Sequence, residues 1–148
     1  MEKIIIYTDG GARGNPGPGA MGAVFCDAKG TILKKYGEYL GDKITNNEAE
    51  YRAVIFALKK AKSLFGKEKM RVAEIEVRSD SELLVNQLNG KYKILEETLQ
   101  TLFLLVWNLK VELPRVKFVA VPREKNKEAD RLVNEALDAQ VGARKLIE

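Results

Sequence analysis

Hydrophobic and polar positions follow patterns that divide the chain into strands and helices. An apolar run at residues 4–8 ends at Asp9 and gives way to glycines, which predicts a buried strand that carries Asp9 to the edge of a sheet. Two further apolar runs, residues 19–27 and 31–40, are separated by a short turn that contains Gly30. They predict an antiparallel hairpin attached to the first strand.

The first helix is predicted over residues 45–64, because Thr and Asn side chains cap helix starts and the spacing that follows is helical. One stripe of this helix is expected to face the sheet, and it contains Glu50, Ala53, Val54, Ala57, Leu58, Ala61 and Phe65. Glu48 falls on another stripe with Arg52 and Lys59. Of the two glutamates, Glu50 is therefore the one aimed at the sheet.

A second strand that ends on a carboxylate follows. Residues 66–69 read as a solvated connection, and alternating apolar positions over residues 72–80 predict a strand that ends at Asp80. Residues 81–88 predict a short helix. The first strand, the helix over residues 45–64 and the strand over residues 72–80 imply a parallel pair of strands with a right-handed crossover. Asp9 and Asp80 are therefore expected at the same end of the sheet.

The last part of the chain is predicted to hold a long helix, a strand and a closing helix. The long helix spans about residues 94–113 and is apolar over more than one face, which favours a core position over a partner surface. Residues 116–121 predict the last strand, and Asn126 caps the closing helix. Asp130 borders the buried stripe of that helix, which contains Ala129, Leu132, Val133, Ala136 and Leu137.

A chain of 148 residues suits a single domain, and we expect its core over residues 3–140 and a tail at residues 141–148. Cys26 is the one cysteine, so no internal disulfide is expected. We find neither a signal-peptide pattern nor an apolar run long enough to span a membrane. These features predict a cytoplasmic protein.

Charge and the absence of histidine narrow the possible chemistry. The 25 Lys and Arg against 21 Asp and Glu give a net charge of +4, which suits a polyanionic partner without requiring one. The sequence contains no histidine, which excludes histidine acid–base catalysis, serine–histidine triads and imidazole zinc sites. Any chemistry must use carboxylates, lysines or metal-bound water.

Four acidic residues fall at two strand ends and in the first turns of two helices, namely Asp9, Glu50, Asp80 and Asp130. A cluster of these groups needs cations, because close like charges repel. Oxygen ligands without histidine or cysteine favour Mg²⁺, with Mn²⁺ as a substitute. Two such ions about 3.5–4 Å apart would activate a water and stabilise the leaving oxygen of a phosphodiester.

The four acids lie in motifs that together resemble those of type 1 ribonuclease H over residues 4–138. In chain order the motifs are Tyr7-Thr8-Asp9-Gly10-Gly11 with Gly14-Asn15-Pro16-Gly17, Thr45-Asn46-Asn47 before Glu50, Ser79-Asp80-Ser81, and Asn126-Lys127-Glu128-Ala129-Asp130. The resemblance implies an α/β, ribonuclease H-like fold with a five-stranded mixed sheet in the order 3-2-1-4-5. Strands 1, 2 and 3 would be antiparallel, strands 1, 4 and 5 parallel, and helices would cover both faces.

The resemblance also implies an activity. The enzyme would be an endonuclease that hydrolyses the RNA strand of RNA–DNA hybrids, independently of sequence, and leaves 5′-phosphate and 3′-hydroxyl ends. Asp9 would bridge two metal ions, with Glu50 and Asp80 completing one site and Asp130 the other. Double-stranded RNA stays open as a second substrate, and we expect a monomer without an obligatory protein partner.

By the same resemblance, the minor groove of the hybrid would contact Gly10, Gly11, Asn15, Asn46 and Glu82. Lys43 and Thr45 would hold a phosphate of the DNA strand. Recognition would rest on the 2′-hydroxyl and on groove shape rather than on base edges.

Two features depart from many bacterial relatives. The loop before Asp130 lacks the histidine thought to assist proton transfer or product release, and Arg123, Glu124 or Lys125 would have to replace it. Residues 89–93 lead almost directly into the next helix, so the long basic protrusion is missing, as in short archaeal and some bacterial members. Substrate binding is therefore expected to depend on Lys91, Lys93 and basic residues of the loop, including Arg123.

Two other interpretations stay open at this point. One is a catalytically inactive module that binds hybrid or double-stranded RNA. The other is a different nuclease or strand-transfer reaction on the same fold, because a fold does not determine its chemistry.

Overall fold

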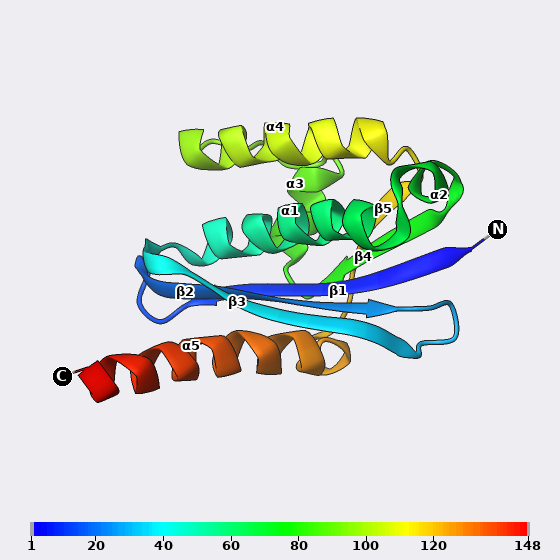
Figure 1. The fold of residues 1–148 in the computed structure, drawn as a ribbon. Coiled ribbons are helices and arrows are strands. Elements are labelled where there is room, and N and C mark those ends of the chain that lie inside the picture. The colour runs from blue at the N-terminus through cyan, green and yellow to red at the C-terminus, as the bar shows by residue number, and fades with distance from the viewer. Residues whose placement is uncertain (1, 148) are drawn as a thin grey trace.

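The structure, a computed structural model, describes residues 2–147. Its centre is a mixed sheet of five strands, β1 (Lys3–Ala12), β2 (Gly17–Cys26), β3 (Ile32–Ile44), β4 (Glu74–Ser79) and β5 (Val116–Ala120), as Figure 1 shows. The strand order is β3-β2-β1-β4-β5. β1 pairs with β2, and β2 with β3, in the antiparallel sense, whereas β1, β4 and β5 are parallel. The predicted sheet is confirmed.

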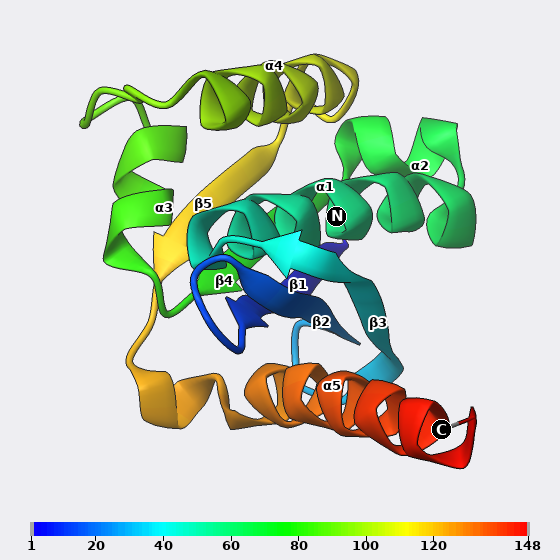
Figure 2. The same ribbon diagram turned by 90° about the vertical axis from the view of Figure 1, so that its left-hand side faces the viewer.

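Helices cover both faces of this sheet (Figures 1 and 2). They are α1 (Asn46–Phe65), α2 (Lys67–Val72), α3 (Glu82–Leu88), α4 (Glu97–Glu112) and α5 (Lys127–Ile147), and a 3₁₀ turn spans Arg123–Lys125. α1 packs on the sheet and α4 packs on α1, whereas α5 packs on the opposite face, against β1, β2 and β3. None of the helices within residues 2–147 combines the length and the apolar character needed to cross a membrane.

Alternating side chains of the central strands fill two hydrophobic layers. Ile4 and Ile6 of β1 point into the larger core under α1, with Ile75 and Val77 of the neighbouring β4. Ile5 points the other way, into a smaller cluster that contains Val24, Cys26, Ala129 and Leu132. Successive side chains of a strand point to opposite faces of the sheet, so one apolar run can contribute to both hydrophobic layers.

The structure corrects three details of the sequence reading. Part of the expected solvated connection at residues 66–69 belongs to the short helix α2. The long helix α4 starts at Glu97 rather than near residue 94, and only part of its apolar surface is in the core. Leu99, Val106 and Leu109 are buried, whereas the exposed side chains of this helix include Leu104, Leu105, Trp107 and Val111.

The expected tail is the third correction. α5 continues to Ile147, so residues 141–147 are helical, and residue 148 lies outside the described part of the chain. The extension lacks an apolar stripe, and a polar contact ties it to the sheet. Arg144 and Tyr39 of β3 both bond to Asp42, which is also on β3.

Candidate active site

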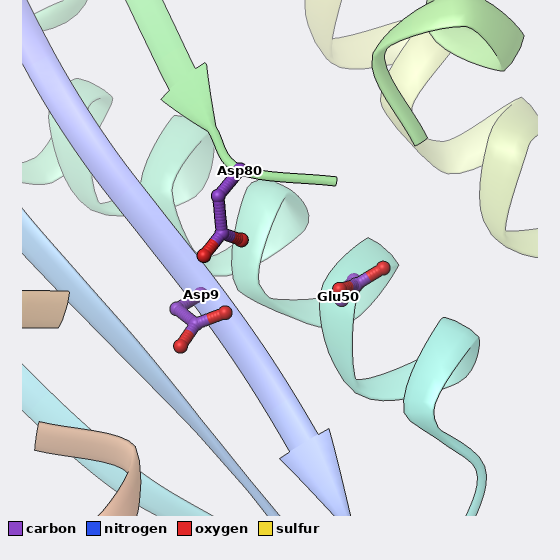
Figure 3. A group of neighbouring side chains, drawn as sticks. All are labelled: Asp9, Glu50 and Asp80. Atoms are coloured by element: carbon purple, nitrogen blue, oxygen red, sulfur yellow. The ribbon is translucent and has the colours of Figure 1, made fainter. Parts of the chain in front are cut away.

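Three carboxylates meet where β1, β4 and α1 come together (Figure 3). Asp9 lies on β1, Asp80 follows β4, and Glu50 projects from the first turns of α1. One oxygen from each residue lies within 4.8 Å of the oxygens of the other two. The parallel register of β1 and β4, which aligns Tyr7 with Arg78, places Asp9 and Asp80 at the same edge. The predicted proximity of Asp9 and Asp80 is confirmed. Asp9 lies inside β1 rather than at its end, because the pairing of β1 with β2 continues to Ala12.

A glycine allows α1 to approach β1 closely enough to bring Glu50 into the cluster. A Cβ atom on Gly10 would lie 2.3 Å from the backbone carbon of Ala49, which no side chain could tolerate. The start of α1 is fixed by Thr45, whose hydroxyl accepts a 3.1 Å hydrogen bond from the Glu48 amide. Glu48 pairs with Arg52 instead of facing the cluster, so the helix-face choice of Glu50 is correct.

The environment of Asp9 opposes its ionisation. Burial, followed by the charges of Asp80, Asp130 and Glu50, raises the pKa of Asp9 from 3.8 to about 8, although a hydrogen bond from the Gly10 backbone opposes the shift. Without a cation, the carboxyl group therefore holds a proton near neutral pH. A bound divalent cation would reverse this preference, because it stabilises the charged form.

Glu50 has a similar but smaller shift. Burial is the largest cause that raises the pKa of Glu50 from 4.5 to about 7, and the charge of Asp80 adds to it. A hydrogen bond with the Ser81 side chain acts in the opposite direction. Ser81 also caps α3, since its Oγ accepts a hydrogen bond from the Leu84 amide. The same residue thus starts a helix and orients a carboxylate of the cluster.

The fourth predicted acid, Asp130, stands at the edge of the site. It is an exposed residue in the first turn of α5 and is outside the set of three oxygens that meet within 4.8 Å. Asp130 nevertheless lines the same cavity of about 400 Å³ as the other three acids, and its charge contributes to the raised pKa of Asp9. The structure therefore gathers all four acids around one cavity but makes only three of them a close cluster.

Close backbone packing positions the helix that carries Asp130. A Cβ atom on Gly22 of β2 would lie 2.4 Å from the Ala129 carbonyl oxygen, so only glycine lets α5 lie this near the sheet. At the start of α5, the buried Asn126 donates from Nδ2 to the Thr8 carbonyl at 2.9 Å. Together these contacts hold Asp130 beside the strand that carries Asp9.

The donor set fits a hard divalent cation. Asp9, Glu50 and Asp80 offer only carboxylate oxygens, which Mg²⁺ and Mn²⁺ prefer. The pKa values of Asp9 and Glu50 are raised, as expected of carboxyl groups that are buried next to other acids without a nearby positive charge. Arg123 places its Nε 3.9 Å from Asp80 Oδ2. Because the arginine side chain is 92% exposed, it offsets little of the negative charge of the cluster.

The residues predicted to contact the substrate fall into three groups. Gly10, Gly11, Asn46 and Arg123 line the acidic cavity itself. Glu82 lines an adjoining cavity with Asp80 and Arg123. The remaining residues line neither of these two cavities, and they are Asn15, Lys43, Thr45, Lys91 and Lys93.

Asn15 and Asn46 have a defined structural role. The Asn46 amide donates to Asn15 Oδ1 at 3.0 Å, and Asn46 Oδ1 accepts from the Ala12 amide at 2.8 Å. These bonds join the loop after β1 to the start of α1. Both asparagines therefore hold in place the backbone that borders the cavity.

Sequence reasoning missed three residues at this site. Arg13 and Asn134 line the cavity, and Ser81 bonds to Glu50. For Asn134 a signal existed, because a residue four positions after Asp130 lies on the same helix face. Nothing local marked Arg13, since its neighbours on α5 are more than 100 positions away in the chain.

The family described as reverse transcriptase-like matches residues 7–136 of the chain. Among solved structures, LC11-RNase H1, isolated from compost by a metagenomic approach, is 50% identical with a TM-score of 0.89, and the match covers 95% of this chain and 99% of that one. RNase H1 from the halophilic archaeon Halobacterium salinarum NRC-1 is 36% identical with a TM-score of 0.84, covering 93% and 98%.

The fold and the acidic site thus define a protein of the reverse transcriptase-like class. Within that class, the chain belongs to the type 1 ribonuclease H family. The eight-residue connection between Leu88 and Glu97 contains no helix, which agrees with the short form of the family without a basic protrusion.

Some relatives are considerably longer. Bifunctional protein Rv2228c of Mycobacterium tuberculosis is 39% identical over 138 residues, which cover 93% of this chain but 36% of that protein. Ribonuclease HI of Halobacterium salinarum is 38% identical over 136 residues, which cover 92% of this chain and 65% of that protein. The chain therefore spans only part of the length of these curated relatives.

Proposed function

We propose that the protein is an endonuclease that hydrolyses the RNA strand of RNA–DNA hybrids, without sequence preference, to 5′-phosphate and 3′-hydroxyl ends. The observation that carries this proposal is the cluster of Asp9, Glu50 and Asp80, whose oxygens lie within 4.8 Å of one another. A second support is LC11-RNase H1, which is 49% identical and has been solved in complex with an RNA/DNA hybrid.

The reaction is proposed to require Mg²⁺, with Mn²⁺ as a substitute, and two ions when substrate is bound. Asp9, Glu50 and Asp80 would hold one ion, and Asp9 with Asp130 would hold the other. When bound, such ions supply an activated water and neutralise charge on the phosphodiester.

The residues of the chain prepare the site for this chemistry. Ser81 keeps Glu50 directed at the cluster, and Asn126 keeps the start of α5 against β1. Gly10 lines the cavity and lets α1 pack against β1, which brings Glu50 to the other two acids. Since the loop before Asp130 has no histidine, we assign assistance of product release there to Arg123, whose exposed, permanently charged side chain can contact a phosphate.

We propose that basic residues outside the cavity bind the duplex. Lys91 and Lys93 are exposed in the short connection after α3, and Gln87 Nε2 donates to the Lys93 carbonyl at 3.3 Å. Gln87 is buried and accepts a 2.6 Å hydrogen bond from the Tyr51 hydroxyl, so the connection is tied to α1. Lys43, at the end of β3, would add a contact to the DNA strand. Each such phosphate contact makes binding depend on salt.

The test is cleavage of an end-labelled RNA–DNA hybrid in Mg²⁺ and in Mn²⁺, with double-stranded RNA and each single strand in parallel. We expect cuts in the RNA strand of the hybrid, none in a chelator and none by Asp9→Asn. If the folded wild-type protein binds the hybrid but cuts it with neither metal, the chain is a binding module. Cleavage of single strands at the same rate would indicate another nuclease.

Cytoplasmic location and a monomeric state stay predictions. Gel filtration checks the monomeric state.

A further inference from the structure

Arg13 is a second cation at the wall of the acidic cavity. The cavity lining includes Arg123 beside Asp80 and Arg13 in the loop that follows β1. The Arg13 guanidinium contacts α5, the helix that carries Asp130, rather than the carboxylates. The family resemblance gave no role to this residue.

The side chain of Arg13 is held in place without being buried. Its Nη2 lies 2.8 Å from Asp138 Oδ1 and donates to Asn134 Oδ1 at 3.5 Å. The backbone is fixed as well, since the Arg13 amide donates to the Pro18 carbonyl at 2.8 Å. With 44% of its side chain exposed, the guanidinium is oriented and still accessible to a ligand.

Asn134 joins this arginine to the acidic site. While its Oδ1 accepts from Arg13, its Nδ2 donates to the Asp130 carbonyl at 3.1 Å and lies 3.5 Å from Asp130 Oδ2. A group bound by Arg13 would therefore lie along the same cavity wall as the carboxylate of Asp130.

The existing partner of Arg13 is easy to replace. The Asp138 side chain is 70% exposed, and an ion pair in such a position contributes little to stability. A phosphate offers the guanidinium a stronger, bidentate set of charge-assisted hydrogen bonds. A cavity rimmed by four acids also repels a polyanion at its entrance, which a cation at the rim offsets.

We propose that Arg13 binds a phosphate of the nucleic-acid backbone, other than the phosphate that reaches the carboxylates, and that Asn134 positions its guanidinium for this contact. The inference rests on the proposed function, because it takes an RNA–DNA hybrid as the ligand. Arg13 acts in binding and not in the chemical step.

The test measures binding of a short fluorescein-labelled RNA–DNA hybrid over a series of salt concentrations. Each variant carries Asp9→Asn as well, so that the probe stays intact. Arg13→Gln is compared with Arg13→Lys and with Arg71→Gln, which removes the same charge from an exposed position on α2, beyond the far end of α1 from Glu50. Circular dichroism establishes that each variant is folded.

We expect Arg13→Gln to weaken binding about fivefold and to reduce the slope of log K against log salt by about 0.7–0.9, the value for one lost phosphate contact. Arg13→Lys should keep the slope, because it keeps the charge, and Arg71→Gln should match the parent. If Arg13→Gln and Arg71→Gln have the same affinity and slope, the inference is wrong.

Wild-type cleavage, measured in parallel, separates this result from the proposed function. A protein that cuts the hybrid while Arg13→Gln binds like its control overturns only the role of Arg13. If the wild type binds the hybrid without cutting it, the proposed activity fails, and the salt series still decides the role of Arg13. Absence of any hybrid binding by the folded protein overturns both.

Discussion

Asn126 donates a 2.9 Å hydrogen bond to the carbonyl of Thr8, although 118 positions separate the two residues in the chain. Both residues are buried. Thr8 immediately precedes Asp9, and the Asn126 carbonyl accepts a 3.1 Å hydrogen bond from the Asp130 amide. A single side chain therefore ties the strand with the central acid to the helix with the outermost one.

Loss of this bond should reduce activity more than stability explains. We expect Asn126→Ala to cost about 1–3 kcal/mol of unfolding free energy, because it removes a buried hydrogen bond to the Thr8 carbonyl, and to lower hybrid cleavage at least tenfold. Asn89→Ala is the matched control, since Asn89 Nδ2 donates to the Phe118 carbonyl at 3.1 Å elsewhere in the fold. Urea unfolding and initial cleavage rates check both. Equal losses of activity in the two variants would show that Asn126 only stabilises the fold.

Neutralising Asp9 should separate activity from folding. Burial and three neighbouring carboxylates disfavour the ionised form of Asp9, and Asp9→Asn removes this charge. We therefore expect the metal-free variant at about pH 8 to unfold at a higher urea concentration than the wild type. Cleavage should fall by more than about a thousandfold, because the carboxylate charge that would hold the proposed cations is lost. A variant that cuts the hybrid at the wild-type rate would refute the assignment of Asp9.

Stability without metal should decrease as the pH rises. The pKa of Asp9 is raised to about 8 and that of Glu50 to about 7, so the folded protein binds more protons than the unfolded chain between about pH 4 and 8. The stabilisation from these protonated groups is complete below about pH 4 and is lost as the pH rises through the folded values. Urea midpoints in a chelator at about pH 5 and about pH 8 measure this, and Asp9→Asn should flatten the profile. An unchanged profile in that variant would contradict the crowding of the carboxylates.

Added Mg²⁺ should act in the opposite direction. Cations bind only the ionised carboxylates, so the increase in the urea midpoint caused by Mg²⁺ should be larger at about pH 8 than at about pH 5. The comparison uses the same wild-type protein with chelator and with Mg²⁺. An increase that is independent of pH would place the bound ion away from Asp9 and Glu50.

Two adjacent glycines should respond differently to an added methyl group. At Gly10 the new Cβ would lie 2.3 Å from the Ala49 backbone, whereas at Gly11 the nearest atom, Val133 Cγ1, would be 3.8 Å away. We expect Gly10→Ala to lose more than about 2 kcal/mol of unfolding free energy and Gly11→Ala less than about 1 kcal/mol. Thermal unfolding of both variants is the measurement. Equal stabilities would mean that α1 does not lie this close to β1.

The end of the chain offers a test of the helix that the sequence did not predict. Gly142 lies inside α5 with no atom within 4 Å of an added Cβ. Gly142→Ala should therefore stabilise the protein by about 0.5–1 kcal/mol, the helix-propensity difference between the two residues. Gly30→Ala, at a turn with φ of 88°, should instead destabilise it. If Gly142→Ala leaves the melting temperature unchanged, residues 141–147 are not helical in solution.

Local periodicity was sufficient to predict most elements of this fold. The isoleucine run before Asp9 alternates between two cores, and the seven-residue stripe of α1 faces the sheet as its spacing indicated. That spacing also selected Glu50 over Glu48. Such predictions succeed because a side chain's direction within one helix or strand depends only on the backbone period.

The apolar breadth of α4 shows where periodicity is insufficient. Trp107 and Val106 are neighbours in sequence and both apolar, yet Trp107 is 54% exposed and Val106 is 2% exposed. Which face of a broadly apolar helix is covered depends on the partner, here α1, and not on the helix itself.

The sequence by itself determined where the acids lie along the chain, which helix face Glu50 occupies and that Asp80 follows a strand directly. Only the tertiary structure decided that three acids form a close cluster while Asp130 borders it, that α5 continues to Ile147, and that Arg13 meets Asn134. The reason is physical: a residue's own neighbours fix its direction, whereas distances between segments far apart in the chain depend on how closely the backbones pack. At Gly10 and Gly22 that packing leaves no room for even a single added carbon atom.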